Sequence, residues 1–275
     1  MVRAPILAVL LAAPILADAG QSSRGQSSRA RASAALVGAL IELENAETVS
    51  IGTRDELELS ASYFAPRNKK QLAPAALLVH DAGRSRAQLM TIAQRLWKSN
   101  FAVLVIDVRG HGGSRTESTD WTQLDEEGQA KLWAIATRDL EAAASWLRKR
   151  KEVHSTNLNL VGAGAGCALA VRHAARDENV RAIALLAPAP EQFGFDVAGE
   201  IQDLGGLPTW IVSRKAERTA TEAMVQEAHQ ASGGHPYIDL MFCSAKPEQE
   251  VVADKRATSQ LVKWLKEKAF PRRRK

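Results

Sequence analysis

The chain has 275 residues, of which 45% are hydrophobic and 24% charged, an ordinary globular composition with room for one sizeable α/β domain. The net charge of +5 comes from the two ends of the chain, and without these ends the remainder is slightly negative. No zinc-ligand spacing, RNA-binding signature or basic stripe with interleaved aromatic residues is present, so the sequence argues against a nucleic-acid partner.

The first 19 residues have the pattern of an export signal. Arg3 supplies a positive start, residues 6–16 are apolar, and Ala17-Asp18-Ala19 resembles a small-residue cleavage site. Because a membrane-spanning helix needs about 20 apolar residues, this stretch is too short to cross a bilayer comfortably. We therefore expect a signal peptide over 1–19 and a mature protein that is periplasmic or extracellular, without stable membrane insertion. An uncleaved anchor is the alternative.

Residues 20–46 are predicted to be a flexible linker and lead-in, since they are rich in Ser and Arg and contain a Gln-Ser-Ser-Arg repeat without apolar periodicity. A basic tail follows at 271–275. The basic ends are either solvated or contact an acidic surface, and solvation is the favoured interpretation.

Between these ends, residues 47–270 are predicted to form one α/β domain. Apolar, β-branched runs alternate with helical stretches, which is typical of a mainly parallel sheet with helices on both faces. Strands are expected at 48–51, 57–64, 75–80, 101–107, 157–162, 180–187, 207–213 and 237–242, with the first two forming a hairpin. Helices are expected at 85–99, 131–150, 166–176, 219–231 and 258–269. The segment 188–206 is too short for a large cap domain, so a pocket above the sheet should be open.

Three motifs follow in order along this domain. A strand ends in His-Asp-Ala-Gly at 80–83, the next ends in Asp-x-Arg-Gly-x-Gly-Gly-Ser at 107–114, and a third leads into Gly-Ala-Gly-Ala-Gly at 162–166. Together they resemble the α/β-hydrolase superfamily, in particular its esterase, dienelactone-hydrolase and serine-aminopeptidase-like branches. The resemblance implies an α/β-hydrolase fold with an eight-stranded, mainly parallel sheet and a G-x-S-x-G nucleophile elbow at the third motif.

The residues required for hydrolysis are missing from the expected places. Gly164 stands where the serine nucleophile belongs. The acid position falls on Ala216, with Glu217 one residue displaced, and the loop at 244–250 that should carry the histidine has none. The sequence thus predicts a degenerate catalytic triad, and a glycine also relieves the backbone strain of an elbow turn.

What remains is a set of backbone N–H groups, at Asp81 or Ala82 and at Ala165, that would line a vestigial oxyanion hole. We therefore predict a non-catalytic binding or structural module whose partner is a small molecule with an anionic or carbonyl group, or a protein. The alternative is an active esterase or amidase with an atypical site.

Further alternatives concern single residues near the turn. Cys167 as a substitute nucleophile is disfavoured, because it should lie in the first helical turn without a base. A disulfide between Cys167 and Cys243 stays open. The glycines at 162–166 imperfectly match a dinucleotide loop, but no acidic residue ends the next strand, so nucleotide binding is the least favoured function. No cofactor or metal is expected, and Asp107, Arg109 and His111 are expected to stabilise their loop.

Overall fold

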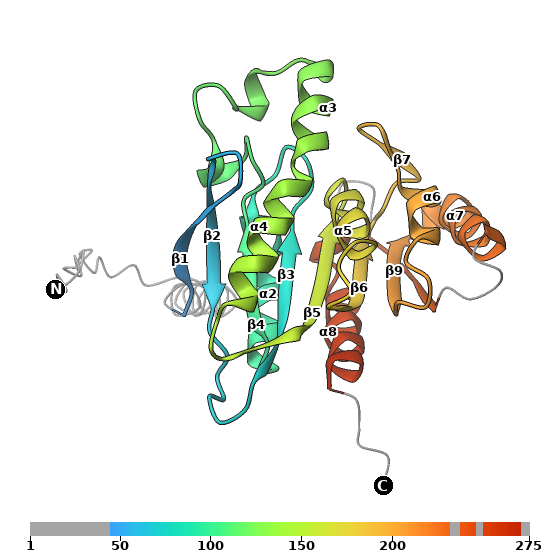
Figure 1. The fold of residues 1–275 in the computed structure, drawn as a ribbon. Coiled ribbons are helices and arrows are strands. Elements are labelled where there is room, and N and C mark those ends of the chain that lie inside the picture. The colour runs from blue at the N-terminus through green and yellow to red at the C-terminus, as the bar shows by residue number, and fades with distance from the viewer. Residues whose placement is uncertain (1–44, 232–236, 246–249, 271–275) are drawn as a thin grey trace, which may run out of the picture. The chain divides into compact units, whose positions relative to one another are not determined.

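Eight strands form one sheet in the computed structural model, which describes residues 45–231, 237–245 and 250–270 (Figure 1). The strands are β1 (Glu47–Gly52), β2 (Glu58–Phe64), β3 (Ala73–Val79), β4 (Ala102–Ile106), β5 (Val153–Ala163), β6 (Val180–Leu186), β9 (Thr209–Arg214) and β10 (Ile238–Cys243). Their order across the sheet is β1-β2-β4-β3-β5-β6-β9-β10. The β1–β2 and β2–β4 pairs are antiparallel and the others are parallel, which confirms the predicted topology.

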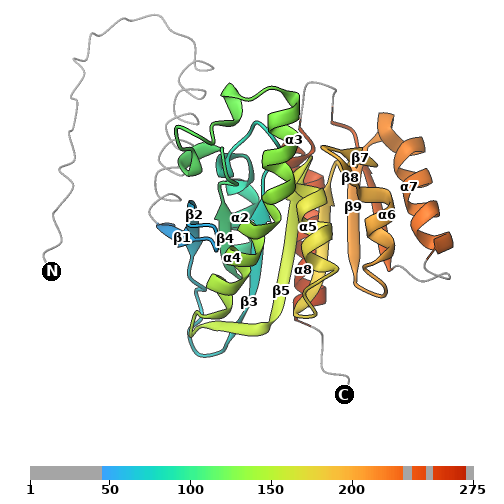
Figure 2. The same ribbon diagram turned by 45° about the horizontal axis from the view of Figure 1, so that its top comes forward.

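Helices cover both faces of the sheet (Figures 1 and 2). They are α2 (Met90–Lys98), α3 (Glu126–Ile135), α4 (Thr137–Arg148), α5 (Gly166–Ala174), α6 (Val197–Gln202), α7 (Arg218–Ala231) and α8 (Lys255–Ala269). Five short 3-10 turns lie at Arg86–Leu89, Gly112–Ser114, Trp121–Gln123, Lys215–Glu217 and Val251–Ala253 in the described residues. α2 and α8 pack on one face, while α4, α5, α6 and α7 pack on the other.

The central strands are apolar throughout because both of their faces are buried. In β4, Leu104 and Ile106 pack into the core beneath α4 and α5, whereas Val103 and Val105 pack into the core beneath α2 and α8. Alternate side chains point to opposite faces of a strand, so each central strand contributes to two cores.

Two regions differ in detail from the predicted elements. The helix expected over 131–150 is two helices, α3 and α4, separated at Ala136, and α3 begins earlier, at Glu126. Asp125 caps that start, since its Oδ1 accepts a hydrogen bond from the Gly128 N–H at 2.8 Å. The segment 188–206, for which the sequence predicts no element, contains the two-residue strands β7 (Glu191–Gln192) and β8 (Phe195–Asp196) together with α6. As predicted, this segment does not form a large cap domain.

The predicted signal peptide at 1–19, nearly all of the predicted linker and the tail at 271–275 lie outside the described residues. Across the ranges that are described, no helix is long and apolar enough to span a membrane.

The parallel strands place their carboxyl ends along one edge of the sheet, and the loops that carry the three motifs meet there (Figure 2). The loop after β3 carries Asp81, the loop after β4 carries His111, and the turn after β5 carries Gly164. In open parallel sheets this edge is where ligands bind.

Candidate functional site

Gly164 lies in the sharp turn between β5 and α5, where its φ is +52°. Its N–H donates to the Leu186 carbonyl at 2.9 Å, and its own carbonyl accepts from the Cys167 N–H at 3.0 Å. The flanking Gly166 permits close packing, since a Cβ there would lie 2.5 Å from the His80 carbonyl oxygen. The turn therefore has the strand–turn–helix geometry of a nucleophile elbow without a nucleophile.

The side chain of Asp81 occupies the space in front of this turn. A Cβ built on Gly164 would lie 2.1 Å from the Asp81 carboxyl carbon, far inside van der Waals contact. Asp81 Oδ1 accepts hydrogen bonds from the Ala165 N–H at 2.7 Å and from the Ala82 N–H at 2.8 Å. These are two of the N–H groups that the sequence predicts for an oxyanion hole. The carboxyl group of Asp81 therefore occupies both of them.

Beyond these two hydrogen bonds, Asp81 has few polar partners in the described residues. Its own N–H donates to Gln88 Oε1 at 2.9 Å, so this backbone group does not face the hole. Burial raises the pKa of the Asp81 carboxyl, partly offset by the Ala165 and Ala82 hydrogen bonds. No cation of the described chain lies within ion-pair distance of it, and the two N–H groups provide its main stabilisation.

The two residues at the predicted acid position follow strand β9. Ala216 and Glu217 lie in the short 3-10 turn Lys215–Glu217. Glu217 does not orient a histidine: its Oε2 accepts from the Arg214 N–H at 3.1 Å, and its Oε1 accepts from Arg214 Nε at 2.8 Å. This carboxylate caps the turn and pairs with the guanidinium of Arg214.

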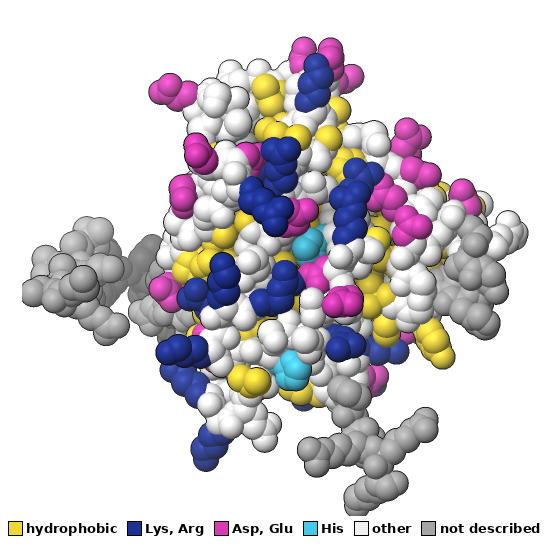
Figure 3. All heavy atoms as spheres, in the orientation of Figure 1, with side chains coloured by type: hydrophobic (Ala, Val, Ile, Leu, Met, Phe, Trp, Pro, Cys, Tyr) yellow, Lys and Arg dark blue, Asp and Glu magenta, His cyan; other side chains and the backbone are white. Residues whose placement is uncertain are grey.

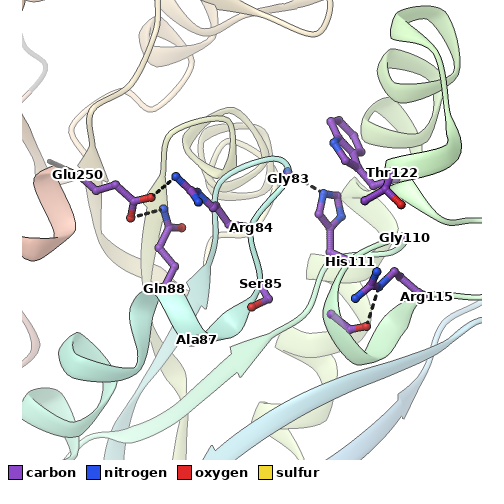
Figure 4. A pocket seen from close by; sticks show the side chains of 12 residues that line it. Gly83, Arg84, Ser85, Ala87, Gln88, Gly110, His111, Arg115, Thr122 and Glu250 are labelled. Carbon is purple, nitrogen blue, oxygen red and sulfur yellow. Dashed lines mark hydrogen bonds and ion pairs between the residues drawn. The ribbon is translucent and has the colours of Figure 1, made fainter. Parts of the chain in front are cut away.

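No histidine follows residue 235 in the sequence, so the loop before α8 cannot supply the histidine of a triad. The two buried histidines near the sheet edge have other partners. His80 Nε2 accepts from the Val108 N–H and its Nδ1 donates to the Asp81 carbonyl. His111 Nε2 accepts from the Gly83 N–H (Figure 4), and its Nδ1 donates to the Arg109 carbonyl.

Both rings are therefore neutral and hold loops together. Burial lowers the pKa of His80 to about 4 and also lowers the pKa of His111. Removing a proton from a nucleophile would require either ring to give up one of its loop hydrogen bonds.

The loop after β4 is held by buried ion pairs, as the sequence analysis expected. Asp107 accepts from the Arg86 N–H at 2.7 Å and from the Gly113 N–H at 2.8 Å. Arg109 donates from Nε to Asp139 Oδ1 at 2.9 Å, and the buried Asp139 also accepts from the Arg109 N–H. Asp107, Arg109 and His111 thus have structural roles.

Two cavities lie at this edge of the sheet. One of about 330 Å³ opens over Gly164 and Asp81, and a neighbouring one of about 480 Å³ is lined by His111, Arg115 and Trp121 among others. Between them, Glu250 pairs with Arg84 at 2.7 Å and accepts from Gln88 Nε2 at 3.1 Å (Figure 4). These three side chains line both cavities, so a ligand that filled both would have to displace them.

Neither cysteine provides substitute chemistry. Both are free and buried, so they form no disulfide. Cys167 lies in the first turn of α5, its Sγ contacts the Leu186 carbonyl at 3.6 Å, and burial raises the pKa of the thiol, which disfavours the thiolate. Within the described ranges, no group of three His, Cys, Asp or Glu side chains could hold a metal ion.

Sequence reasoning placed Gly164, Ala82 and Ala165 at one site but missed the Asp81 side chain. The sequence carries one signal for it, since Asp81 is a charged residue that directly follows a buried strand, in the first of the three motifs. The Asp81 carboxylate lies where a side chain at position 164 would be, so its position requires the glycine there.

Sequence comparison identifies one family model, described as serine aminopeptidase, S33, over residues 71–250. No curated protein matches the chain in sequence.

Several solved structures are similar in fold. The esterase Pf2001 of Pyrococcus furiosus has a TM-score of 0.64 at 18% identity, over 83% of this chain and 95% of that chain. The α/β hydrolase GrgF of Penicillium sp. sh18 has a TM-score of 0.64 at 14% identity, over 82% and 99%. A dienelactone hydrolase of Anabaena variabilis has a TM-score of 0.62 at 18% identity, over 81% and 95%. At these identities the likeness concerns the fold alone.

Proposed function

Since the chain belongs to the serine aminopeptidase S33 family of the α/β-hydrolase superfamily, we propose that it is a non-catalytic binding protein that has kept the hydrolase fold without the hydrolytic chemistry. The observation that carries this proposal is the Asp81 carboxylate in the oxyanion hole. Acyl transfer requires the hole to receive the negative charge that develops on the substrate oxygen. Here a negative charge already holds both N–H donors.

Three further features support the proposal. Gly164 offers no hydroxyl, Glu217 is engaged with Arg214, and the chain after residue 235 contains no histidine. Loss of any one triad member lowers the rate of hydrolysis by orders of magnitude, because the members of a triad act together.

The ligand is expected in the cavity over Gly164 or in its neighbour. The sequence predicts an anionic or carbonyl-bearing small molecule, or a protein partner. An anion that used the hole itself would have to displace Asp81 first, so groups that tolerate a carboxylate nearby fit this cavity better.

The test is direct. Purified protein is treated with a fluorophosphonate probe and with a panel of short-chain activated esters, and a serine hydrolase of known activity serves as positive control. We expect neither covalent labelling nor turnover. Stoichiometric labelling, or turnover that survives substitution of Gly164 but is lost on substituting another residue, would establish the alternative of an active esterase or amidase with an atypical site.

Nucleotide binding is a weaker candidate for a physical reason. A phosphate at the start of α5 would need the Ala165 N–H that Asp81 already holds, and it would meet the carboxylate as a like charge. A thermal-shift screen with NAD, FAD and ATP tests this, and a shift that grows with ligand concentration would favour it.

We also propose that the protein is exported, on the sequence of residues 1–19 alone. N-terminal sequencing of the mature protein after expression with its own signal tests this, and a start near Gly20 is expected.

A further inference from the structure

A groove between α4 and α5 gathers positive charge away from the Gly164 site. It has a volume of about 400 Å³ and is lined by residues of α4, of the end of α5 and of the β1–β2 turn. None of its lining residues borders the two cavities at the sheet edge. Figure 3 shows Lys and Arg side chains gathered over α4 and α5, with a histidine and acidic side chains between them.

Four guanidinium groups line this groove, and two of them form no ion pair with a described residue. The four are Arg54, Arg148, Arg172 and Arg176, against the carboxylates of Glu141 and Asp177. Arg148 pairs with Asp177, and Arg172 pairs with Glu200 beside the groove. Arg54 and Arg176 form no ion pair with any residue of the described chain.

Favourable interaction with helix dipoles explains part of this arrangement. Arg148 and Arg172 lie in the last turns of α4 and α5, and Arg176 follows closely, where cations are stabilised. It does not explain Arg54, which comes from the β1–β2 turn and still lines the same groove. Arg148 and Arg172 are paired with carboxylates and Arg176 shares the groove with Glu141, so Arg54 leaves the groove with one positive charge that a bound anion would balance.

Two of the guanidiniums are held in fixed positions. Arg172 donates from Nε to Glu200 Oε2 at 3.1 Å, and its guanidinium carbon lies 3.9 Å from the centroid of the Phe195 ring. Asp177, the partner of Arg148, is itself held by the Asn179 N–H at 3.0 Å. Preorganised donors lose less conformational entropy on binding a ligand.

We propose that this groove binds the phosphate group of a small molecule. Guanidinium groups recognise carboxylate and phosphate by paired N–H···O bonds. A phosphate has three terminal oxygens and can be contacted from several sides, as the positions of Arg54, Arg148 and Arg176 on three different segments require, whereas a carboxylate offers a single planar edge. Thr137 and Ser145 of α4 also line the groove. The volume suits a phosphate ester of modest size.

The experiment measures binding of inorganic phosphate, glycerol 1-phosphate and glycerol to the whole protein by calorimetry at low ionic strength. We expect saturable binding of both phosphates and none of glycerol. In the variant R54A/R176A the affinity should fall about tenfold or more, because the two unpaired guanidiniums are lost. Both side chains are exposed and unpaired, so the variant should fold, which circular dichroism verifies.

The matched control is R67A/K69A, which removes two positive charges from exposed positions outside the groove. It should bind phosphate within about twofold of the unsubstituted protein. Tighter binding of the ester than of inorganic phosphate shows that the organic part also contacts the groove, and the reverse shows that phosphate alone is recognised; both support the proposal. Absence of saturable phosphate binding, or an equal loss in the two variants, overturns it.

Discussion

Replacing Gly164 by serine tests the central geometric claim, that residue 164 and the Asp81 carboxylate compete for one space. In G164S the new Cβ would lie 2.1 Å from Asp81 Oδ1 and 2.4 Å from Oδ2, so the carboxylate has to leave. It then loses its bonds to the Ala165 and Ala82 N–H groups. The substitution should therefore destabilise the fold without producing hydrolysis.

The expected magnitude has two parts. Two hydrogen bonds to a charged group contribute about 3–6 kcal/mol together, of which water around the displaced carboxylate recovers a share. A side chain at φ +52° adds about 1–2 kcal/mol of backbone strain. We expect the free energy of unfolding to fall by about 3–5 kcal/mol in G164S. Removing the carboxylate as well, in D81G/G164S, should leave mainly the strain.

Urea denaturation of the two single variants and the double variant gives the coupling free energy between the two positions. We expect a coupling of at least about 2 kcal/mol, with the double variant no less stable than G164S. Gly205 supplies the control, because its φ is +55° and a Cβ there meets nothing within 4 Å. G205S should show the strain alone. Additive effects of the two substitutions, or equal losses in G164S and G205S, would refute the reasoning.

Three other predictions concern the surroundings of the site. The pKa of His80 is lowered to about 4 in the folded protein, so as the pH falls the unfolded chain takes up a proton before the folded one. This group should therefore lower the free energy of unfolding by about 2 kcal/mol between pH 7 and pH 5, and an unchanged urea midpoint would contradict it. Asp139→Ala leaves Arg109 without its buried partner and should lower the unfolding free energy by about 3–5 kcal/mol, clearly more than Asp55→Ala at the rim of the same network, as thermal and urea unfolding would reveal. The Cys167 thiol should react with iodoacetamide only after denaturation, and labelling of the native protein detected by mass spectrometry would show that the thiol is accessible.

Much of the fold could be predicted because the pattern of the central strands is strong. Runs such as 101–107 are apolar without a break, which in a chain of alternating strands and helices indicates a parallel sheet buried on both faces. The break between α3 and α4 could not be predicted, because Ala136 is a good helix former and no glycine or proline lies in residues 131–140. The start of α3 at Glu126 did carry a signal, namely the capping Asp125.

The backbone of the candidate site could be predicted from the sequence, but the side chain that occupies it could not. The position of Gly164 in a strand–turn–helix motif follows from local sequence, since strand, turn and helix are adjacent along the chain. The contact between Asp81 and Ala165 joins two loops 84 residues apart, and only the register of β3 beside β5 brings them together. The groove that contains Arg54 and Arg176 could not be predicted either, because its lining residues come from segments far apart in the sequence.

The position of the Asp81 carboxylate in front of Gly164 limits which substitutions could give this chain hydrolase activity. The Asp81 carboxylate cannot take this position while residue 164 has a side chain. If the chain descends from a serine enzyme, the change to glycine at position 164 therefore came before the carboxylate took this position. With Asp81 in this position, serine at residue 164 would meet the carboxylate, glycine at residue 81 alone would leave the turn without a nucleophile, and either change would still lack the histidine. Engineering of activity into this scaffold should therefore begin at position 81.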